Sequence, residues 1–173
     1  MSRRLIVAFA AVAIAGLTVV GMANAGDGKL SSELQAVRAA VAKYHSYDQA
    51  VADGYSLQGE PCVSSPAGAM GIHAPNRALS MDPGLDPLKP EILLYAPAAG
   101  GSYKLVGVEY FKADADQNLA TANDRPSLFG RAFDGPMLGH NPTMPIHYDL
   151  HVWVAEQNPA GVFAQFNPDV SCR

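Results

Sequence analysis

The segment that decides the fold reads His147-Tyr148-Asp149-Leu150-His151-Val152-Trp153-Val154. Its side chains alternate with a period of two, which is typical of a β-strand. As a strand, the segment presents Tyr148, Leu150, Val152 and Val154 on one face and His147, Asp149, His151 and Trp153 on the other. The sequence therefore predicts a strand over residues 147–155 that carries a row of ionisable groups on one face.

A helix over the same segment is the alternative interpretation. It would place His147 and His151 one turn apart, as in zinc proteases, but it would turn Asp149 away from them. Tyr148 also stands where the H-E-x-x-H motif of those enzymes has glutamate. In a strand the two histidines are roughly 13 Å apart, at about 3.3 Å per residue. We therefore expect only one of them to bind a given ion directly.

Three further strands are predicted on either side of this segment. Residues 92–96 and 103–111 are apolar runs separated by an Ala-Ala-Gly-Gly turn, and a short run at 162–166 follows an Asn-Pro-Ala-Gly turn. The segments 55–90 and 113–146 are rich in glycine and proline and are expected to be long ordered loops.

The first part of the mature chain has helical character. Apolar residues recur at helical spacing over 32–53, with start signals at Ser32 and Ser46 and a break near His45. Helices before residue 54 and strands after residue 91 predict an α+β fold. In this fold, N-terminal helices pack on a small antiparallel β-sheet or partial barrel with long ordered loops.

The N-terminus has the pattern of a signal peptide over residues 1–25. Arg3 and Arg4 precede an apolar run, and Ala23-Asn24-Ala25 resembles a cleavage site. An uncleaved membrane anchor is the alternative. The remaining residues, 26–173, form one predicted domain with a net charge of −6, because the two arginines are lost from a chain of net charge −4. We expect a periplasmic or secreted protein that binds no nucleic acid and, after cleavage, no membrane.

The chain has two cysteines, Cys62 and Cys172. In an exported protein, such a pair is typical of a disulfide, which here would close a loop of about 110 residues. Two thiolate ligands for a soft metal are the alternative.

Glu109 is the one carboxylate in a predicted strand that is apolar on both faces, and we place it on the face of Leu105 and Phe111. A buried carboxylate must be paired, protonated or bound to a metal. An ion pair with Arg77 or Arg131 is the alternative to a functional role. Two more histidines lie beside glycines in the predicted loops. The candidate site residues are His73, Glu109, His140, His147, Asp149 and His151.

At least three of these six side chains are expected to converge around a cleft walled by Trp153 and Phe111. Imidazoles and carboxylates are ligands for divalent transition metals such as zinc. Copper is the other candidate, because Met70, Met137 and Met144 lie near the histidines in the sequence. The first hypothesis is an exported metal-binding protein, possibly a metal-dependent enzyme. The others are a metal-free small-ligand binder or acid–base enzyme, and a secreted structural or interaction protein.

Several motifs resemble those of a family of uncharacterised exported bacterial proteins. They are Met70-Gly71-Ile72-His73, Val108-Glu109-Tyr110, the segment from His147 to Trp153, and Asn167-Pro168-Asp169-Val170-Ser171-Cys172. The resemblance covers roughly residues 31–172. It implies export and supports the choice of candidate residues, and it implies no particular reaction.

Overall fold

The computed structural model describes residues 25–139 and 144–173. The predicted signal peptide, except Ala25, and the candidate ligand His140 lie outside the described residues. The helical elements are α1 (Ala25–Val41), η1 (Ala42–His45), α2 (Tyr47–Ala52), α3 (Arg77–Ser80) and η2 (Ala99–Gly101). The strands are β1 (Cys62–Ser65), β2 (Gly68–Pro75), β3 (Ile92–Pro97), β4 (Tyr103–Ala113), β5 (Ser127–Leu128), β6 (Arg131–Ala132), β7 (Asp134–Met137) and β8 (His147–Val152).

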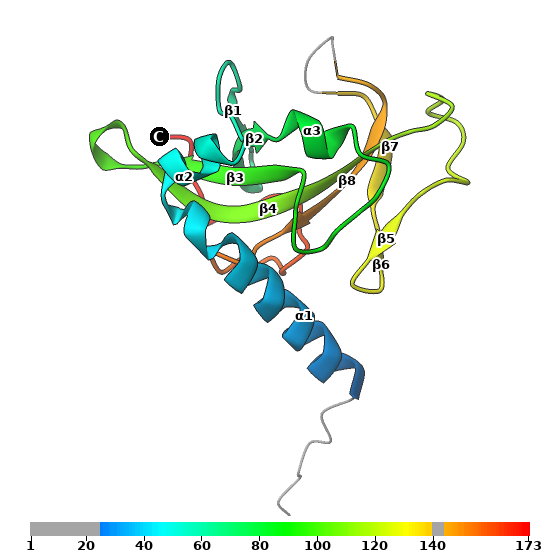
Figure 1. Ribbon diagram of the computed structural model, residues 1–173, viewed down its shortest axis with the longest axis horizontal. Helices are drawn as coiled ribbons and strands as arrows, with labels where there is room; N and C mark the ends of the chain where they lie inside the picture. Colours follow the sequence, from blue (N-terminus) through cyan, green and yellow to red (C-terminus); the bar gives the residue numbers. More distant parts are fainter. Residues whose placement is uncertain (1–24, 140–143) are drawn as a thin grey trace, which may run out of the picture.

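Six of these strands form one antiparallel sheet in the order β1-β2-β3-β4-β8-β7, and β5 and β6 form a separate two-stranded ribbon. The large sheet curls, with α1 and α2 on one side of it (Figure 1). The predicted α+β fold with a small antiparallel sheet is confirmed. No helix in the described part of the chain combines the length and the apolarity that a membrane span requires.

The two faces of the sheet carry separate apolar clusters. The helix-side cluster joins Val37 and Val41 of α1 to Tyr95, Tyr110 and other strand side chains. The opposite cluster contains Phe111, Trp153 and Val170, the last from the C-terminal tail. The helices therefore cover one face, and the tail contributes to the cover of the other.

The helical region differs from the prediction at its beginning. Ser46 is the N-cap of α2, and its hydroxyl accepts a hydrogen bond from the backbone N–H of Gln49, as the sequence predicts. Ser32, however, lies inside α1, which begins at Ala25. The expected start at Ser32 is wrong, because the helix continues for about two turns before it.

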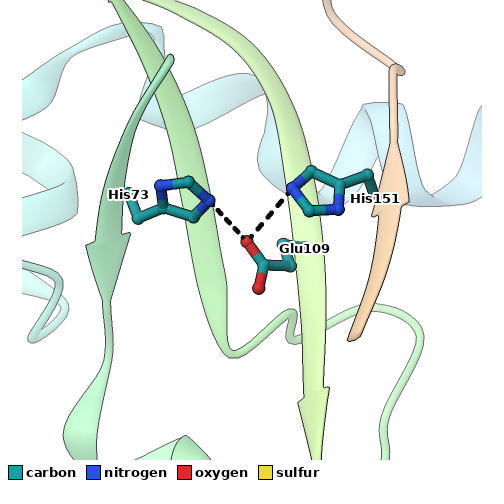
Figure 2. Close-up of side chains that lie close together, drawn as sticks. All are labelled: His73, Glu109 and His151. Carbon is teal, nitrogen blue, oxygen red and sulfur yellow. Dashed lines mark ion pairs between the residues drawn. The ribbon is translucent and has the colours of Figure 1, made fainter. Parts of the chain in front are cut away.

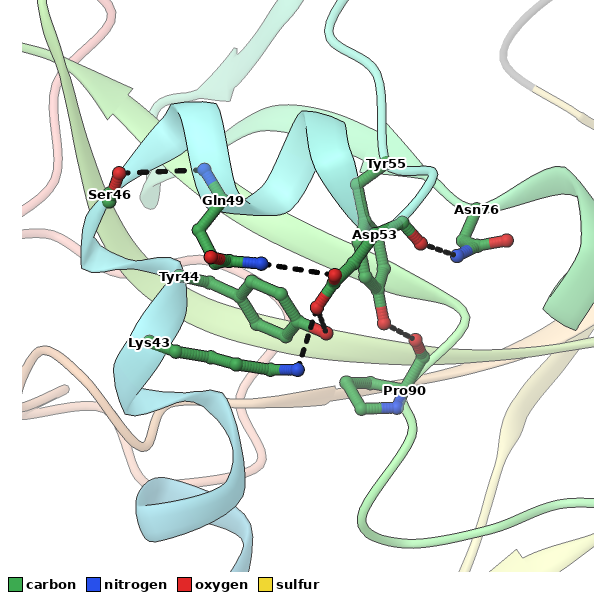
Figure 3. A network of polar contacts seen from close by, with 8 residues as sticks. All are labelled: Lys43, Tyr44, Ser46, Gln49, Asp53, Tyr55, Asn76 and Pro90. Atoms are coloured by element: carbon green, nitrogen blue, oxygen red, sulfur yellow. Dashed lines mark hydrogen bonds and ion pairs between the residues drawn. The ribbon is translucent and has the colours of Figure 1, made fainter.

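Polar contacts join the end of α2 to the sheet (Figure 3). The carboxylate of Asp53 accepts from Tyr44 and Gln49 and pairs with Lys43 at 2.6 Å. The backbone carbonyl of Asp53 accepts from the side chain of Asn76 at 2.9 Å, just beyond β2. These contacts fix the helices relative to the strand that carries His73.

The segment 55–90 is not a long loop, which corrects the sequence interpretation. It contains β1, β2 and the short α3, and His73 lies on β2. Gly71, one of the glycines that suggested a loop, allows close strand packing instead. Gly71 has a φ of +95°, and a Cβ at this position would lie 2.6 Å from the carbonyl oxygen of Tyr95 on β3. The segment 113–146 also contains strands, β5 to β7.

The predicted strand at 162–166 is absent, and β8 ends at Val152. The backbone N–H of Trp153 does donate to the carbonyl of Val162. Val162 and Phe163 nevertheless both pack against the helix-side cluster. Two successive side chains of a strand cannot face the same side, so this segment forms turns.

A bulge in β4 corrects the expected neighbours of Glu109. Tyr95 pairs with Leu105 and Leu94 pairs with Gly107, so Val106 is an extra residue. The bulge turns Leu105 to the helix-side cluster, whereas Glu109 and Phe111 face the other way. Glu109 therefore does not share a face with Leu105.

The predicted disulfide between Cys62 and Cys172 is confirmed, with Cα atoms 5.6 Å apart. It excludes these cysteines as thiolate ligands, and it indicates a non-reducing compartment. The tail before Cys172 is also hydrogen-bonded to β2 through Asn167 and Ala69. The disulfide and these bonds hold the tail against the sheet face that carries His73.

Replacing Gly71 with alanine should destabilise the fold by about 2–4 kcal/mol, because positive φ and the close Tyr95 carbonyl both oppose a Cβ. Gly59 is a matched control. It also has a positive φ, +81°, but a Cβ there meets nothing within 4 Å. Urea denaturation should show a much smaller loss of unfolding free energy for Gly59→Ala than for Gly71→Ala. Equal losses would show that contact with β3 is unimportant.

Candidate functional site

Three candidate residues come together on the sheet face opposite the helices. Glu109 of β4 is directly paired with His151 of β8. On its other side, Glu109 pairs with Ile92 of β3, and β3 pairs in turn with β2, which carries His73. The three side chains therefore come from three strands, with β3 between the strands of His73 and Glu109 (Figure 2).

One oxygen of Glu109 is the centre of this cluster. Oε2 of Glu109 lies 2.9 Å from Nε2 of His73 and 3.5 Å from Nε2 of His151. In Figure 2 both imidazoles point their nitrogens at this oxygen. Glu109 and His151 are fully buried, and His73 is 7% exposed. One donor atom from each of the three residues lies within 4.8 Å of the other two, a spacing that can accommodate a metal ion.

Two other candidates lie beside this cluster. Asp149 lies on the same face of β8 as His151. Its Oδ1 is 3.8 Å from Nδ1 of His151, and its Oδ2 is 4.0 Å from Nε2 of His147. His147 stacks on Phe111, and its Nδ1 lies 3.1 Å from the carbonyl oxygen of Pro145. Asp149 and His147 are fully buried but do not belong to the three-donor group found among the described residues.

The charges of the cluster stabilise one another. Burial opposes ionisation of Glu109, but the facing imidazoles of His73 and His151 outweigh it and hold the pKa of this carboxyl well below its usual range. Burial likewise disfavours the charged form of His151, but Glu109 and Asp149 raise its pKa overall. An ionised Glu109 thus faces two basic nitrogens inside the protein.

Asp149 is a buried carboxylate whose nearest ionisable partners are more distant than those of Glu109. Among the described residues, neither of its oxygens has a hydrogen-bond donor, and the nearest opposite groups are the imidazoles at about 4 Å. Burial of a carboxylate without such donors is costly. A positive charge at His151, or on an ion bound by His151, would offset this cost.

The three-donor group fits a metal ion chemically. Two imidazole nitrogens and one carboxylate oxygen form the ligand set of several catalytic zinc sites and of non-haem iron sites. Ligand distances near 2.1 Å require donor atoms no more than about 4.2 Å apart. The distances from Oε2 of Glu109 to Nε2 of His73 and to Nε2 of His151, 2.9 and 3.5 Å, meet this limit.

A cavity of about 690 Å³ opens onto this site through His73. Phe111 and Ile92 form part of its apolar wall, as expected for Phe111. Trp153 was expected as the second wall, but it is not among the lining residues. Its indole N–H donates to the carbonyl of Ala164, and its ring belongs to the buried cluster instead.

Glu91 is a buried carboxylate that the sequence interpretation missed. It immediately precedes β3, is 2% exposed, and accepts a hydrogen bond from the backbone N–H of Phe111. Burial raises its pKa to about 7, with a small contribution from Glu109. Its position at the edge of an apolar run, between Pro90 and Ile92, was the available signal.

Replacing Glu91 with glutamine should stabilise the protein at alkaline pH only. Because the folded-state pKa lies above the unfolded value, Glu91 contributes its stability below about pH 4.5 and loses it as the pH rises through 7. Glutamine keeps an acceptor for the backbone N–H of Phe111 and removes this loss of stability, which is about 3 kcal/mol. Thermal unfolding at pH 5 and pH 8.5 checks the difference. Equal effects at both values would contradict it.

Searches with the sequence and the structure found no matching protein-family model, no similar curated protein and no similar solved structure. The role of the site therefore rests on its own geometry and chemistry.

Proposed function

We propose that this chain is an exported protein that binds a divalent transition metal ion through His73, Glu109 and His151. The observation that carries the proposal is the convergence of these donors from three strands at a buried point. Burying three ionisable side chains at one point has a high desolvation cost. A bound cation would offset that cost and use all three groups.

Zinc is the first candidate ion. The donor set contains nitrogen and oxygen but no cysteine sulfur, because both cysteines are in the disulfide. Zinc accepts this combination readily, whereas copper(I) prefers sulfur ligands. Copper(II) remains the second candidate, since imidazole suits it as well.

Two independent features support export of the protein. The signal-peptide pattern at residues 1–25 and the Cys62–Cys172 bond both fit the periplasm or the extracellular space. The motifs around His73, Glu109 and His151 also resemble those of a family of uncharacterised exported bacterial proteins.

With three protein ligands, a zinc ion would retain a coordination position for water or a substrate, and it would activate that water for hydrolysis. His73 is the proposed ligand that borders the cavity, so a small molecule in the cavity would approach the ion from the side of His73. His73, Glu109 and His151 would hold the ion, and the burial of Glu109 and His151 would keep bulk water away from their side of it. A metal-dependent enzyme is therefore the more specific form of the proposal.

The direct test is the metal content of untagged mature protein, followed by zinc titration of chelator-treated protein in a calorimeter. We expect close to one zinc per chain. Replacing Glu109 with glutamine, which preserves its shape, should abolish uptake. His45→Gln is the matched control, because His45 is exposed and lies in η1 on the helical side. Uptake that is equal in all variants would refute the proposal.

Asp149 should act as a positioning residue for His151. When Nε2 of His151 binds the ion, its Nδ1 carries the proton and faces Oδ1 of Asp149 at 3.8 Å, so a small shift of either side chain would form the hydrogen bond that orients the imidazole. Asp149→Asn should therefore weaken zinc affinity by about 10–100-fold without changing the stoichiometry. Calorimetry separates affinity from stoichiometry, and an unchanged affinity would contradict this role.

A metal-free acid–base site is the second candidate, and the 2.9 Å contact between His73 and Glu109 favours it. In that case the carboxylate would tune an imidazole that exchanges protons with a ligand in the cavity. Absence of zinc from native protein, together with weak zinc binding, would favour this function over the first.

A further inference from the structure

The cavity beside His73 has the size and lining of a small-molecule site. Its volume of about 690 Å³ lies within the range of typical ligand pockets. Its walls include Val63, Pro75, Ile92 and Phe111, and His73 connects it to the three-donor group. Because Glu109 and His151 are fully buried, His73 is the member of that group that borders the cavity.

Arg77 gives this cavity a specific polar feature. It is the first residue of α3, it is exposed, and it lines the cavity. Within the described part of the chain, no acidic side chain forms an ion pair with it. The expected alternative of an Arg77–Glu109 ion pair is therefore wrong, since Glu109 faces His73 and His151 instead.

The guanidinium of Arg77 can bind an oxyanion through two parallel hydrogen bonds. The apolar side chains of the same lining, among them Ile92 and Phe111, suit a hydrocarbon chain or ring. Glu60 is the acidic side chain in the same lining, and it would repel an anion placed beside it. Arg77 is therefore the lining side chain that favours the charged group of an anionic ligand, and Glu60 is the one that disfavours it.

We propose that the cavity binds a small organic acid, with its carboxylate on Arg77 and its apolar body along Ile92 and Phe111 towards His73. Binding of the acid in the cavity does not depend on the proposed metal site; only a reaction of the bound acid at the ion rests on the proposed function. The substrate class is thus a carboxylic acid whose reactive end lies away from its carboxylate. Arg77 is then a residue that determines specificity and takes no part in metal binding.

Octanoate is a suitable probe, because it has one carboxylate and an apolar chain. Calorimetry with chelator-treated and zinc-loaded protein should show saturable binding of octanoate in both states. Octanol, which lacks the charge, should bind at least about tenfold more weakly, since a charge-assisted hydrogen bond contributes on the order of 1.5–3 kcal/mol.

The variants make the test specific to Arg77. Arg77→Gln should weaken octanoate binding about tenfold and leave zinc uptake unchanged. Arg38→Gln removes the same charge from a different groove, beside α1, and should bind octanoate normally. Glu60→Gln should bind octanoate as well as or better than the wild type.

The failures of the two proposals are distinguishable. If octanoate does not bind, or if Arg77→Gln and Arg38→Gln weaken it equally, the organic-acid site is refuted whatever the zinc result. If octanoate binds through Arg77 but zinc does not bind at all, the cavity proposal stands and the metal proposal fails.

Discussion

Removing the disulfide should destabilise the protein by about 4–5 kcal/mol. The bond closes a loop between residues separated by 110 positions, and the chain-entropy model gives this magnitude for such a loop. Chemical denaturation of the Cys62→Ser, Cys172→Ser double variant is the measurement. The transition should move to much lower denaturant concentration.

The loss of stability should be largest in the C-terminal tail, which the disulfide anchors. Val170 and Cys172 pack on the sheet face that carries the three-donor group, and Asn167 bonds to β2. Amide exchange near the C-terminus should therefore accelerate more than exchange in α1. A destabilisation below about 1 kcal/mol would show that the tail is held without the bond.

Zinc should raise the unfolding temperature of the wild-type protein by roughly 5–10 °C when present at about 100 times its dissociation constant. Ligand linkage gives about 2.7 kcal/mol under that condition, and each kcal/mol shifts a domain of this size by roughly 2–4 °C. His73→Ala and Glu109→Gln remove one donor each, so zinc should not shift their unfolding temperatures. Differential scanning calorimetry with and without zinc checks both statements.

His45→Gln again serves as the control and should respond to zinc like the wild type. A zinc-dependent shift that persists in both site variants would mean that the ion binds elsewhere or binds nonspecifically.

The prediction of a strand that begins at residue 147 succeeded because alternation is a local signal, although the strand ends at Val152 and not at residue 155. His147, Asp149 and His151 do share a sheet face, and Glu109 lies across from them on the next strand. The bulge at Val106 was not predictable, because it depends on how β3 and β4 align. The turn structure at 162–166 was missed because Val162 and Phe163 are apolar enough to resemble a strand.

The site was predicted by residue type better than by position. His73 was placed in a loop, because the glycines and prolines around it indicate irregular structure when considered alone. Only the pairing of β2 with β1 and β3 shows that these glycines allow close backbone contact. The separation of His147 from the three-donor group follows from strand spacing, which the sequence does provide.

The most direct test of the metal proposal is X-ray diffraction from crystals of the mature, untagged protein grown with zinc, measured on both sides of the zinc absorption edge. The proposal predicts one strong anomalous peak about 2.0–2.2 Å from Nε2 of His73, Nε2 of His151 and a carboxylate oxygen of Glu109. Crystals without a peak at this position, or with zinc only at exposed groups such as His45, would contradict it.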